Sequence, residues 1–145
     1  MPTTIESRLS LAVETAADLM SAPVASIPHL ASFREAVAFF IDRNLTVAPV
    51  AGDRGEPVGV LSIADLLIHV RESAPADKIA PATAATLMTP TVFSVTPETP
   101  ASEVVQDMLR SKVHHLFVAD PDGRIMGVVS TCDVLHHLRP SEPDP

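Results

Sequence analysis

A seven-residue segment, Gly59–Asp65 with the sequence GVLSIAD, recurs 68 residues later as Gly127–Asp133 with the sequence GVVSTCD. In each copy a short apolar run that begins with glycine is followed by a serine, and an aspartate comes three residues after that serine. The apolar run is typical of a β-strand, and Ser-x-x-Asp is typical of the first turn of a helix. The segment therefore predicts a strand that passes directly into a helix, twice in one chain.

The duplication extends well beyond this junction, because residues 18–70 align with residues 86–138 without an insertion or deletion. Before each junction the sequence predicts an amphipathic helix (33–43 and 101–109), with a capping box at Ser32 and Glu35 and with Thr99 and Pro100 as the N-cap and first position of the second helix. A hairpin of two short apolar strands follows each helix. The fold class is α/β, in the α+β sense: two β-α-β-β-α repeats, each with a short helical lead-in at 16–20 or 84–88.

These boundaries divide the chain into five parts. We expect an N-terminal lead-in helix over 1–15, repeat 1 over 16–70, a linker over 71–83, repeat 2 over 84–138 and a disordered tail over 139–145. The linker contains Pro75 and Pro81, and the tail is itself rich in proline.

Composition excludes several classes of function. The formal net charge is −8, and there is no Trp and no Tyr, so neither phosphate neutralisation nor base stacking favours a nucleic-acid partner. A single cysteine, Cys132, forms no internal disulfide, so a cytoplasmic location fits best; no signal peptide or membrane span is expected. No catalytic constellation and no metal-ligand spacing occurs, so we expect neither an enzyme nor a metal site.

The Ser-x-x-Asp segments have two interpretations. A helix N-terminus can hold an anion such as phosphate, with Ser62 or Ser130 adding a hydrogen bond, while Asp65 or Asp133 suits vicinal hydroxyls. A ligand that presents both a phosphate and the vicinal hydroxyls of a ribose is a nucleotide. The other interpretation is structural, since the same spacing forms a capping box that only starts a helix.

The arrangement resembles a tandem pair of CBS domains, named for cystathionine β-synthase. The resemblance covers residues 16–138 and rests on lead-ins Asp18–Ser21 and Thr86–Pro90, the strand Val47–Val50 and the two Gly-Val-x-Ser-x-x-Asp segments. It implies two repeats related by pseudo-two-fold symmetry with their sheets packed together, a regulatory ligand sensor, and clefts for AMP, ADP, ATP, S-adenosylmethionine or NAD, with no cofactor required. An adenosine-containing small molecule and a homodimer are the implied partners, with an effector protein acted on in trans.

Site residues follow from the resemblance. It implies ribose contacts from Asp65 and Asp133 and phosphate contacts from Ser62 and Ser130. The adenine would lie against the first and central strands of each repeat, at Val24, Ala25, Val47 and Pro49 and at Val92, Phe93, His115 and Phe117.

Some of these positions depart from the family pattern. Phe117 replaces the usual proline, and its bulk could fill the adenine pocket or supply a stacking face. His114 and His115 could face phosphate, or they could complement a helix dipole. We therefore expect the two clefts to be unequal, with partial protonation of the histidines favouring a phosphorylated ligand. An alternative function is a dimerisation or protein-interaction module with vestigial clefts. Apolar residues that look exposed, namely Phe39, Phe40, Leu135 and Leu138, favour a homodimer.

Overall fold

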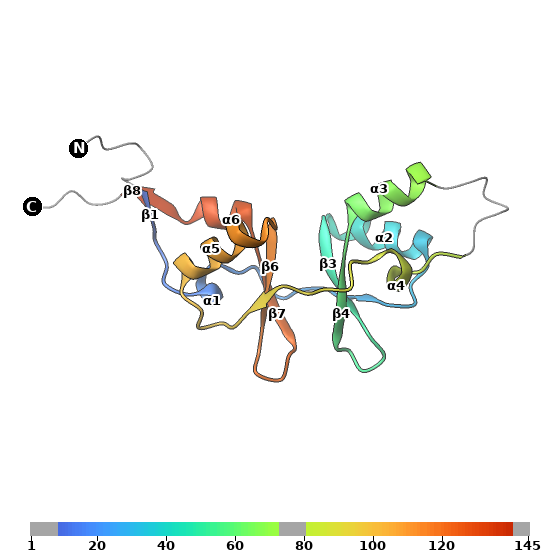
Figure 1. The fold of residues 1–145 in the computed structure, drawn as a ribbon, viewed down its shortest axis with the longest axis horizontal. Helices are drawn as coiled ribbons and strands as arrows, with labels where there is room; N and C mark the ends of the chain where they lie inside the picture. Colours follow the sequence, from blue (N-terminus) through green and yellow to red (C-terminus); the bar gives the residue numbers. More distant parts are fainter. Residues whose placement is uncertain (1–8, 73–80, 141–145) are drawn as a thin grey trace, which may run out of the picture. The chain divides into compact units, whose positions relative to one another are not determined.

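A computed structural model describes residues 9–72 and 81–140 of the 145-residue chain. Its elements, which Figure 1 shows, are listed here in chain order: β1 (Leu9–Leu11), α1 (Ala16–Leu19), β2 (Ile27–Pro28), α2 (Phe33–Arg43), β3 (Val47–Ala51), β4 (Pro57–Ser62), α3 (Ile63–Glu72), α4 (Ala84–Leu87), β5 (Ser94–Val95), α5 (Ala101–Ser111), β6 (His115–Ala119), β7 (Ile125–Ser130), α6 (Thr131–His136) and β8 (Leu138–Pro140).

The chain forms two compact units, and each is described here by itself. The β3–β4 unit comprises residues 24–92, and the β6–β7 unit comprises residues 1–23 and 93–145. The β3–β4 unit therefore contains α4, the lead-in helix of repeat 2, and the β6–β7 unit contains α1, the lead-in helix of repeat 1. Helix α4 contacts β4 and α3, while α1 contacts β7 and α5.

Each unit is built on a three-stranded sheet. In the β3–β4 unit the order is β2-β3-β4, with β2 parallel and β4 antiparallel to β3. The β6–β7 unit repeats this order with β5-β6-β7. Gly55 and Gly123 lie in the hairpin turns with positive φ, a conformation that glycine adopts without steric cost. In Figure 1, α2 and α3 lie on one side of the first hairpin, and α5 and α6 lie on one side of the second.

The ends of the two long helices follow the sequence closely, with two shifts, both in α5, which ends at Ser111 rather than at the expected residue 109. The capping box at Ser32 is confirmed, because Ser32 N donates to Glu35 Oε1 (2.9 Å) and Glu35 N donates to Ser32 Oγ (3.1 Å). Hydrogen bonding to the Glu35 carboxylate, from the Ser32 backbone N–H first and from the Ser32 side chain second, lowers the pKa of Glu35. The N-cap of α5 is Pro100 rather than the expected Thr99.

The segments that flank the repeats differ from the expectation. Residues 9–11 of the expected lead-in helix form strand β1, which pairs antiparallel with β8. Residues 139 and 140 of the expected tail belong to β8, while residues 1–8 and 141–145 lie outside the described part of the chain. The pairing of β1 with β8 joins segments more than a hundred residues apart, so no local sequence pattern predicts it.

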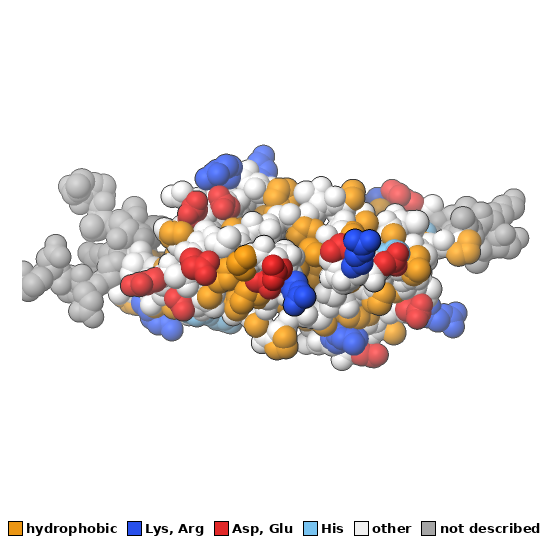
Figure 2. Space-filling model, turned by 90° about the horizontal axis from the view of Figure 1, so that it is seen from below, with side chains coloured by type: hydrophobic (Ala, Val, Ile, Leu, Met, Phe, Trp, Pro, Cys, Tyr) orange, Lys and Arg blue, Asp and Glu red, His pale blue; other side chains and the backbone are white. Residues whose placement is uncertain are grey.

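Each unit has its own aliphatic core. One core includes Ile27, Val50, Leu61 and Ala84, and the other includes Leu19, Val104, Val118 and Val129. The expectation that Phe39 and Phe40 are exposed was wrong, because both rings belong to the first core. Apolar side chains that do reach the surface lie among acidic and basic ones in Figure 2.

Candidate functional site

The strand-to-helix junction of repeat 1 is a capping box. Ser62 ends β4, and its backbone N donates to Asp65 Oδ2 (2.8 Å). The Ser62 hydroxyl donates to the same oxygen (3.0 Å), and Asp65 N donates to Ser62 Oγ (3.2 Å). No hydrogen bond to Asp65 Oδ1 occurs among the described residues. The cap therefore fixes the carboxylate through one oxygen and leaves the other one available.

The junction of repeat 2 has the same two capping bonds that involve backbone N–H groups, lacks the bond from the serine hydroxyl to the carboxylate among the described residues, and has one further contact. Ser130 N donates to Asp133 Oδ2 (2.8 Å), and Asp133 N donates to Ser130 Oγ (3.1 Å). In addition, Ser21 Oγ donates to Asp133 Oδ1 (3.3 Å) from the segment that follows α1. Ser21 and Asp133 are 112 residues apart in sequence, so the motif alone gave no sign of this bond. Both oxygens of Asp133 are thus hydrogen-bonded.

The glycines of the two junctions make room for protein rather than for a ligand. A Cβ at Gly59 would lie 2.5 Å from Met88 Sδ and 2.6 Å from the carbonyl oxygen of Thr89. At Gly127 the close neighbours are side-chain atoms of Met20. The lead-in segments therefore pack directly on the second strand of each hairpin. They fill the space beside both glycines that a ligand would need.

Register brings several expected site residues together within each unit. Val47 is paired with Ser62 across β3 and β4, and His115 is paired with Ser130 across β6 and β7. The two positions correspond, so repeat 2 has an imidazole where repeat 1 has an isopropyl group. Each pair lies at the end of its hairpin where the helix begins.

The two adjacent histidines of repeat 2 lie in different surroundings. His115 is half-buried in β6, and its pKa is lowered by desolvation first and by the neighbouring charge of His114 second, against an opposing effect of Asp133. Partial protonation of His115 near neutrality is therefore not supported. His114 is exposed and lines a groove between α5 and α6, where Lys112 also lies.

The residues expected along the adenine differ in accessibility. Pro49 and Phe117 lie in the middle of β3 and β6 and are buried, whereas Val24, Ala25, Val47 and Val92 are partly exposed. Phe117 therefore offers no exposed stacking face. Phe93 is exposed, and its carbonyl oxygen accepts from Phe117 N (3.0 Å).

Two further features of the described residues bear on function. Within residues 9–72 and 81–140, no three His, Cys, Asp or Glu side chains lie close enough together to hold a metal ion. No helix in the same ranges is both long enough and apolar enough to span a membrane.

The two repeats each match a known family. The family model described as CBS domain matches residues 16–72 and 84–140, so the chain belongs to the CBS-domain family and carries two copies of the domain. This agrees with the paired junctions and with the mixed α/β repeats described above.

Individual relatives agree with this assignment. The chain is 29% identical over 120 residues to the human 5'-AMP-activated protein kinase subunit gamma-3, and 28% identical to the pig protein. The match covers 79% of this chain but only 23–24% of those relatives, so the chain spans about a quarter of their length.

Solved structures share the fold. The cytosolic domain of the Mg²⁺ channel MgtE, in complex with ATP, has a TM-score of 0.71 at 26% identity, over 85% of this chain and 48% of that one. CBSX2 in complex with AMP has a TM-score of 0.71 at 24% identity, over 84% and 93% of the two chains. The CBS-domain pair of MJ0100, with 5'-methylthioadenosine and S-adenosyl-L-methionine, has a TM-score of 0.72 at 22% identity, over 88% and 94%.

Proposed function

We propose that this CBS-domain pair is a regulatory module that binds an adenine nucleotide and transmits its occupancy to an effector protein in trans. The observation that carries the proposal is the repeated junction, in which a capped aspartate lies beside a serine at a helix start. In repeat 1 the free oxygen of Asp65 suits a ribose hydroxyl, because a charged acceptor forms a strong hydrogen bond with it. Relatives of the same fold bind AMP, ATP or S-adenosyl-L-methionine, which supports an adenosine-containing ligand.

The remaining expected contacts complete this proposal. Ser62 would donate to phosphate by turning its hydroxyl away from the Asp65 carboxylate, and Ser130 would donate its hydroxyl hydrogen, which is not directed at Asp133. The adenine ring would lie against Val24, Ala25 and Val47 in one repeat, with Pro49 behind them. In the other repeat it would lie against Val92, Phe93 and His115, with Phe117 behind them. NAD and ADP present the same adenosine, so the proposal covers the class rather than one nucleotide.

The structure changes which half-site we expect to bind ribose better. A ribose hydroxyl meets an available oxygen at Asp65, but at Asp133 it would have to replace the bond from Ser21. A phosphate near His115 would bind to a ring that is largely neutral at pH 7, because its pKa is lowered. We therefore propose that repeat 1 supplies the stronger ribose contact, which reverses the order that the histidines alone had indicated.

Titration calorimetry with AMP tests the proposal. Asp65→Asn should weaken binding by about 10- to 100-fold, since one charge-assisted hydrogen bond contributes about 1.5–3 kcal/mol. Asp133→Asn should weaken it less. Asp122→Asn is the matched control, because that side chain is exposed in a hairpin turn and lies outside both junctions. If the parent protein binds neither AMP, ATP, S-adenosylmethionine nor NAD, the nucleotide-sensor proposal is refuted.

A second function, as a dimerisation module, is favoured by a separate observation. Ile41 and Leu67 in the β3–β4 unit and Leu109 and Leu135 in the β6–β7 unit are all mostly exposed. Exposed aliphatic side chains grouped on helices are typical of an interface. We propose a homodimer, a non-catalytic role and, from the single cysteine and acidic composition, a cytoplasmic location. Sedimentation that shows only monomer at micromolar concentration would contradict the dimer.

A further inference from the structure

Each lead-in segment ends in a methionine whose sulfur lies directly over a glycine of the neighbouring strand. A Cβ at Gly59 would lie 2.5 Å from Met88 Sδ, and a Cβ at Gly127 would lie 2.4 Å from Met20 Sδ. Because ordinary contact with a Cβ begins at 3.4 Å, neither sulfur leaves room for another heavy atom on the side that faces its strand. The two thioethers are therefore packed tightly against the backbone of β4 and of β7.

The Met88 side chain can be reached from solvent. Met88 is partly exposed and lines a surface hollow of about 390 Å³ on the β3–β4 unit. Asp53, Arg54 and Glu56, which are exposed, line the same hollow. A water molecule takes about 30 Å³ of liquid volume, so the hollow admits water and molecules of similar size, hydrogen peroxide among them. A small oxidant therefore has access to the thioether of Met88.

Helix α4, which precedes Met88, depends on its contacts for stability. It has four residues, far fewer than an isolated helix needs. The backbone N of its first residue donates to Ala31 O (2.8 Å). Just beyond the helix, Thr89 and Val60 exchange two backbone hydrogen bonds of 2.9 Å each. Met88 lies between these two anchor points and packs against the first core, so its side chain helps to hold α4 in place.

We propose that Met88 is a site of reversible oxidation, at which a peroxide loosens the packing of α4 on β4. In this step a lone pair of Met88 Sδ attacks one oxygen of hydrogen peroxide, the O–O bond breaks and an S–O bond forms. The sulfur loses two electrons, and the peroxide is reduced to water. The product is methionine sulfoxide, which sulfoxide reductases return to methionine with electrons from thiols.

The sulfoxide does not fit the packing of the reduced side chain. The side of Met88 Sδ that faces Gly59 has no room for the added oxygen, so the oxygen must lie toward the hollow. The S–O group is polar and needs water there, which disfavours its packing against the core. Met88 then holds α4 less firmly, and the bonds between Thr89 and Val60 open more often. Val60 lies on β4 just before Ser62, beside the junction of repeat 1, but the inference does not depend on nucleotide binding.

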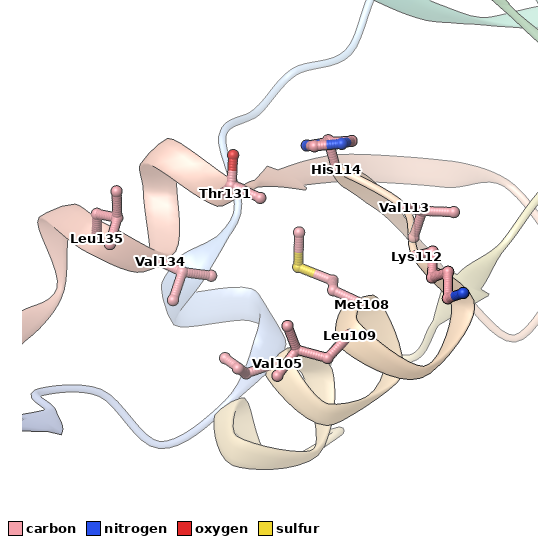
Figure 3. Close-up of a pocket in the computed structure, with 9 residues that line it drawn as sticks. All are labelled: Val105, Met108, Leu109, Lys112, Val113, His114, Thr131, Val134 and Leu135. Carbon is pink, nitrogen blue, oxygen red and sulfur yellow. The ribbon is translucent and has the colours of Figure 1, made fainter. Parts of the chain in front are cut away.

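Two other methionines among the described residues serve as controls. Met126 is 38% exposed on β7, and Met108 is 5% exposed and lies in the groove between α5 and α6 that Figure 3 shows. Neither methionine is among the nearest neighbours of a glycine Cβ position. Because susceptibility to oxidation follows exposure, Met126 should oxidise readily and Met108 slowly, and neither should affect α4.

Peroxide treatment followed by peptide mass spectrometry measures which methionine reacts. Cys132→Ser removes the exposed thiol, which would also react, and Met20→Leu removes the corresponding methionine of the other unit. In this double variant Met88 should oxidise at a rate between those of Met126 and Met108, about tenfold above the latter. Oxidation of Met88 that is as slow as that of Met108 would overturn the proposal.

Amide hydrogen exchange measured by NMR reports the structural consequence. After oxidation the Val60 and Thr89 amides should exchange about tenfold faster, while the Ala101 amide, which donates to Glu14 O in the other unit, keeps its rate. Sulfoxide reductases should restore the slow exchange. The further substitution Met88→Leu conserves the side-chain volume and should abolish the effect of peroxide. Unchanged exchange after oxidation, faster exchange in both units, or an effect that persists in Met88→Leu would each contradict the inference.

Discussion

Adding one methyl group at Gly59 should destabilise the protein more than adding it at Gly127, although the two glycines match in the repeat. An alanine Cβ at Gly59 would lie 2.6 Å from the Thr89 carbonyl oxygen, so about 0.8 Å of movement is needed to reach the 3.4 Å of ordinary contact. That carbonyl accepts from Val60 N at 2.9 Å, and Thr89 N donates to Val60 O at 2.9 Å. The backbone cannot move without straining both bonds.

The magnitude follows from these contacts. Overpacking of this kind costs about 1–3 kcal/mol, and each strained backbone bond adds up to about 1 kcal/mol. The alanine also reduces the conformational entropy of the unfolded chain, which offsets about 0.4–1 kcal/mol of this destabilisation. Gly59→Ala should therefore lower the free energy of unfolding by about 2–3 kcal/mol. At Gly127 the three nearest atoms belong to the Met20 side chain; its Sδ and Cγ can move by a change of rotamer while its Cβ stays at 3.0 Å, so the expected loss is about 1 kcal/mol.

Urea unfolding of the two alanine variants measures this difference. Adding Met20→Ala to Gly127→Ala should show a coupling energy of about 0.5–1 kcal/mol, because it removes the Sδ and Cγ atoms that the new Cβ would meet first. Adding Met88→Ala to Gly59→Ala should leave most of the loss in place, since the Thr89 carbonyl remains. The reasoning is refuted if Gly127→Ala costs as much as Gly59→Ala, because the packed lead-in backbone would then not be what distinguishes the two sites.

Two further predictions concern a helix end and a histidine. Asn44→Lys should lower the free energy of unfolding by about 0.5–1 kcal/mol while Asn44→Gly leaves it nearly unchanged, because only the lysine is strained at positive φ. Chemical denaturation of both variants measures this difference, and equal effects of the two substitutions would contradict it. The pKa of His115 is lowered in the folded protein, so the unfolded state binds protons first and stability should fall as pH drops below about 6.5. In His115→Val, denaturation at pH 7.5 and at pH 5.5 should show a smaller difference, and an unchanged difference would reject His115 as its source.

Much of the fold could be predicted because the duplicated segments contain their own local signals. The junctions, the hairpins and the capping box at Ser32 depend on residues that are neighbours in sequence. The exposed side of α2 could not be predicted in the same way. Residues 36–41 are all apolar, so the pattern does not show which of them face the core, and Ile41 is exposed where Phe39 is buried.

Long-range contacts account for the parts of the candidate site that the sequence did not reveal. The sequence placed a lead-in before each repeat, but it did not show that α1 packs in the β6–β7 unit and α4 in the β3–β4 unit. Met20 and Ser21 therefore reach the junction of repeat 2 from more than a hundred residues away. A sequence repeat also makes its two copies look equivalent, while these contacts make the two aspartates differ.

The capping and binding interpretations of the Ser-x-x-Asp segments are compatible once individual oxygens are considered. Capping uses Oδ2 of each aspartate and thereby fixes where Oδ1 lies, free at Asp65 and bonded to Ser21 at Asp133. An alanine substitution would remove the cap and the proposed ligand contact together, so its effect on AMP binding could come from a displaced helix. Asparagine keeps one oxygen that can accept the cap bond, and it replaces the other oxygen, the proposed ligand acceptor, with an uncharged NH2 donor. The asparagine variants are therefore the ones whose loss of affinity reports on binding.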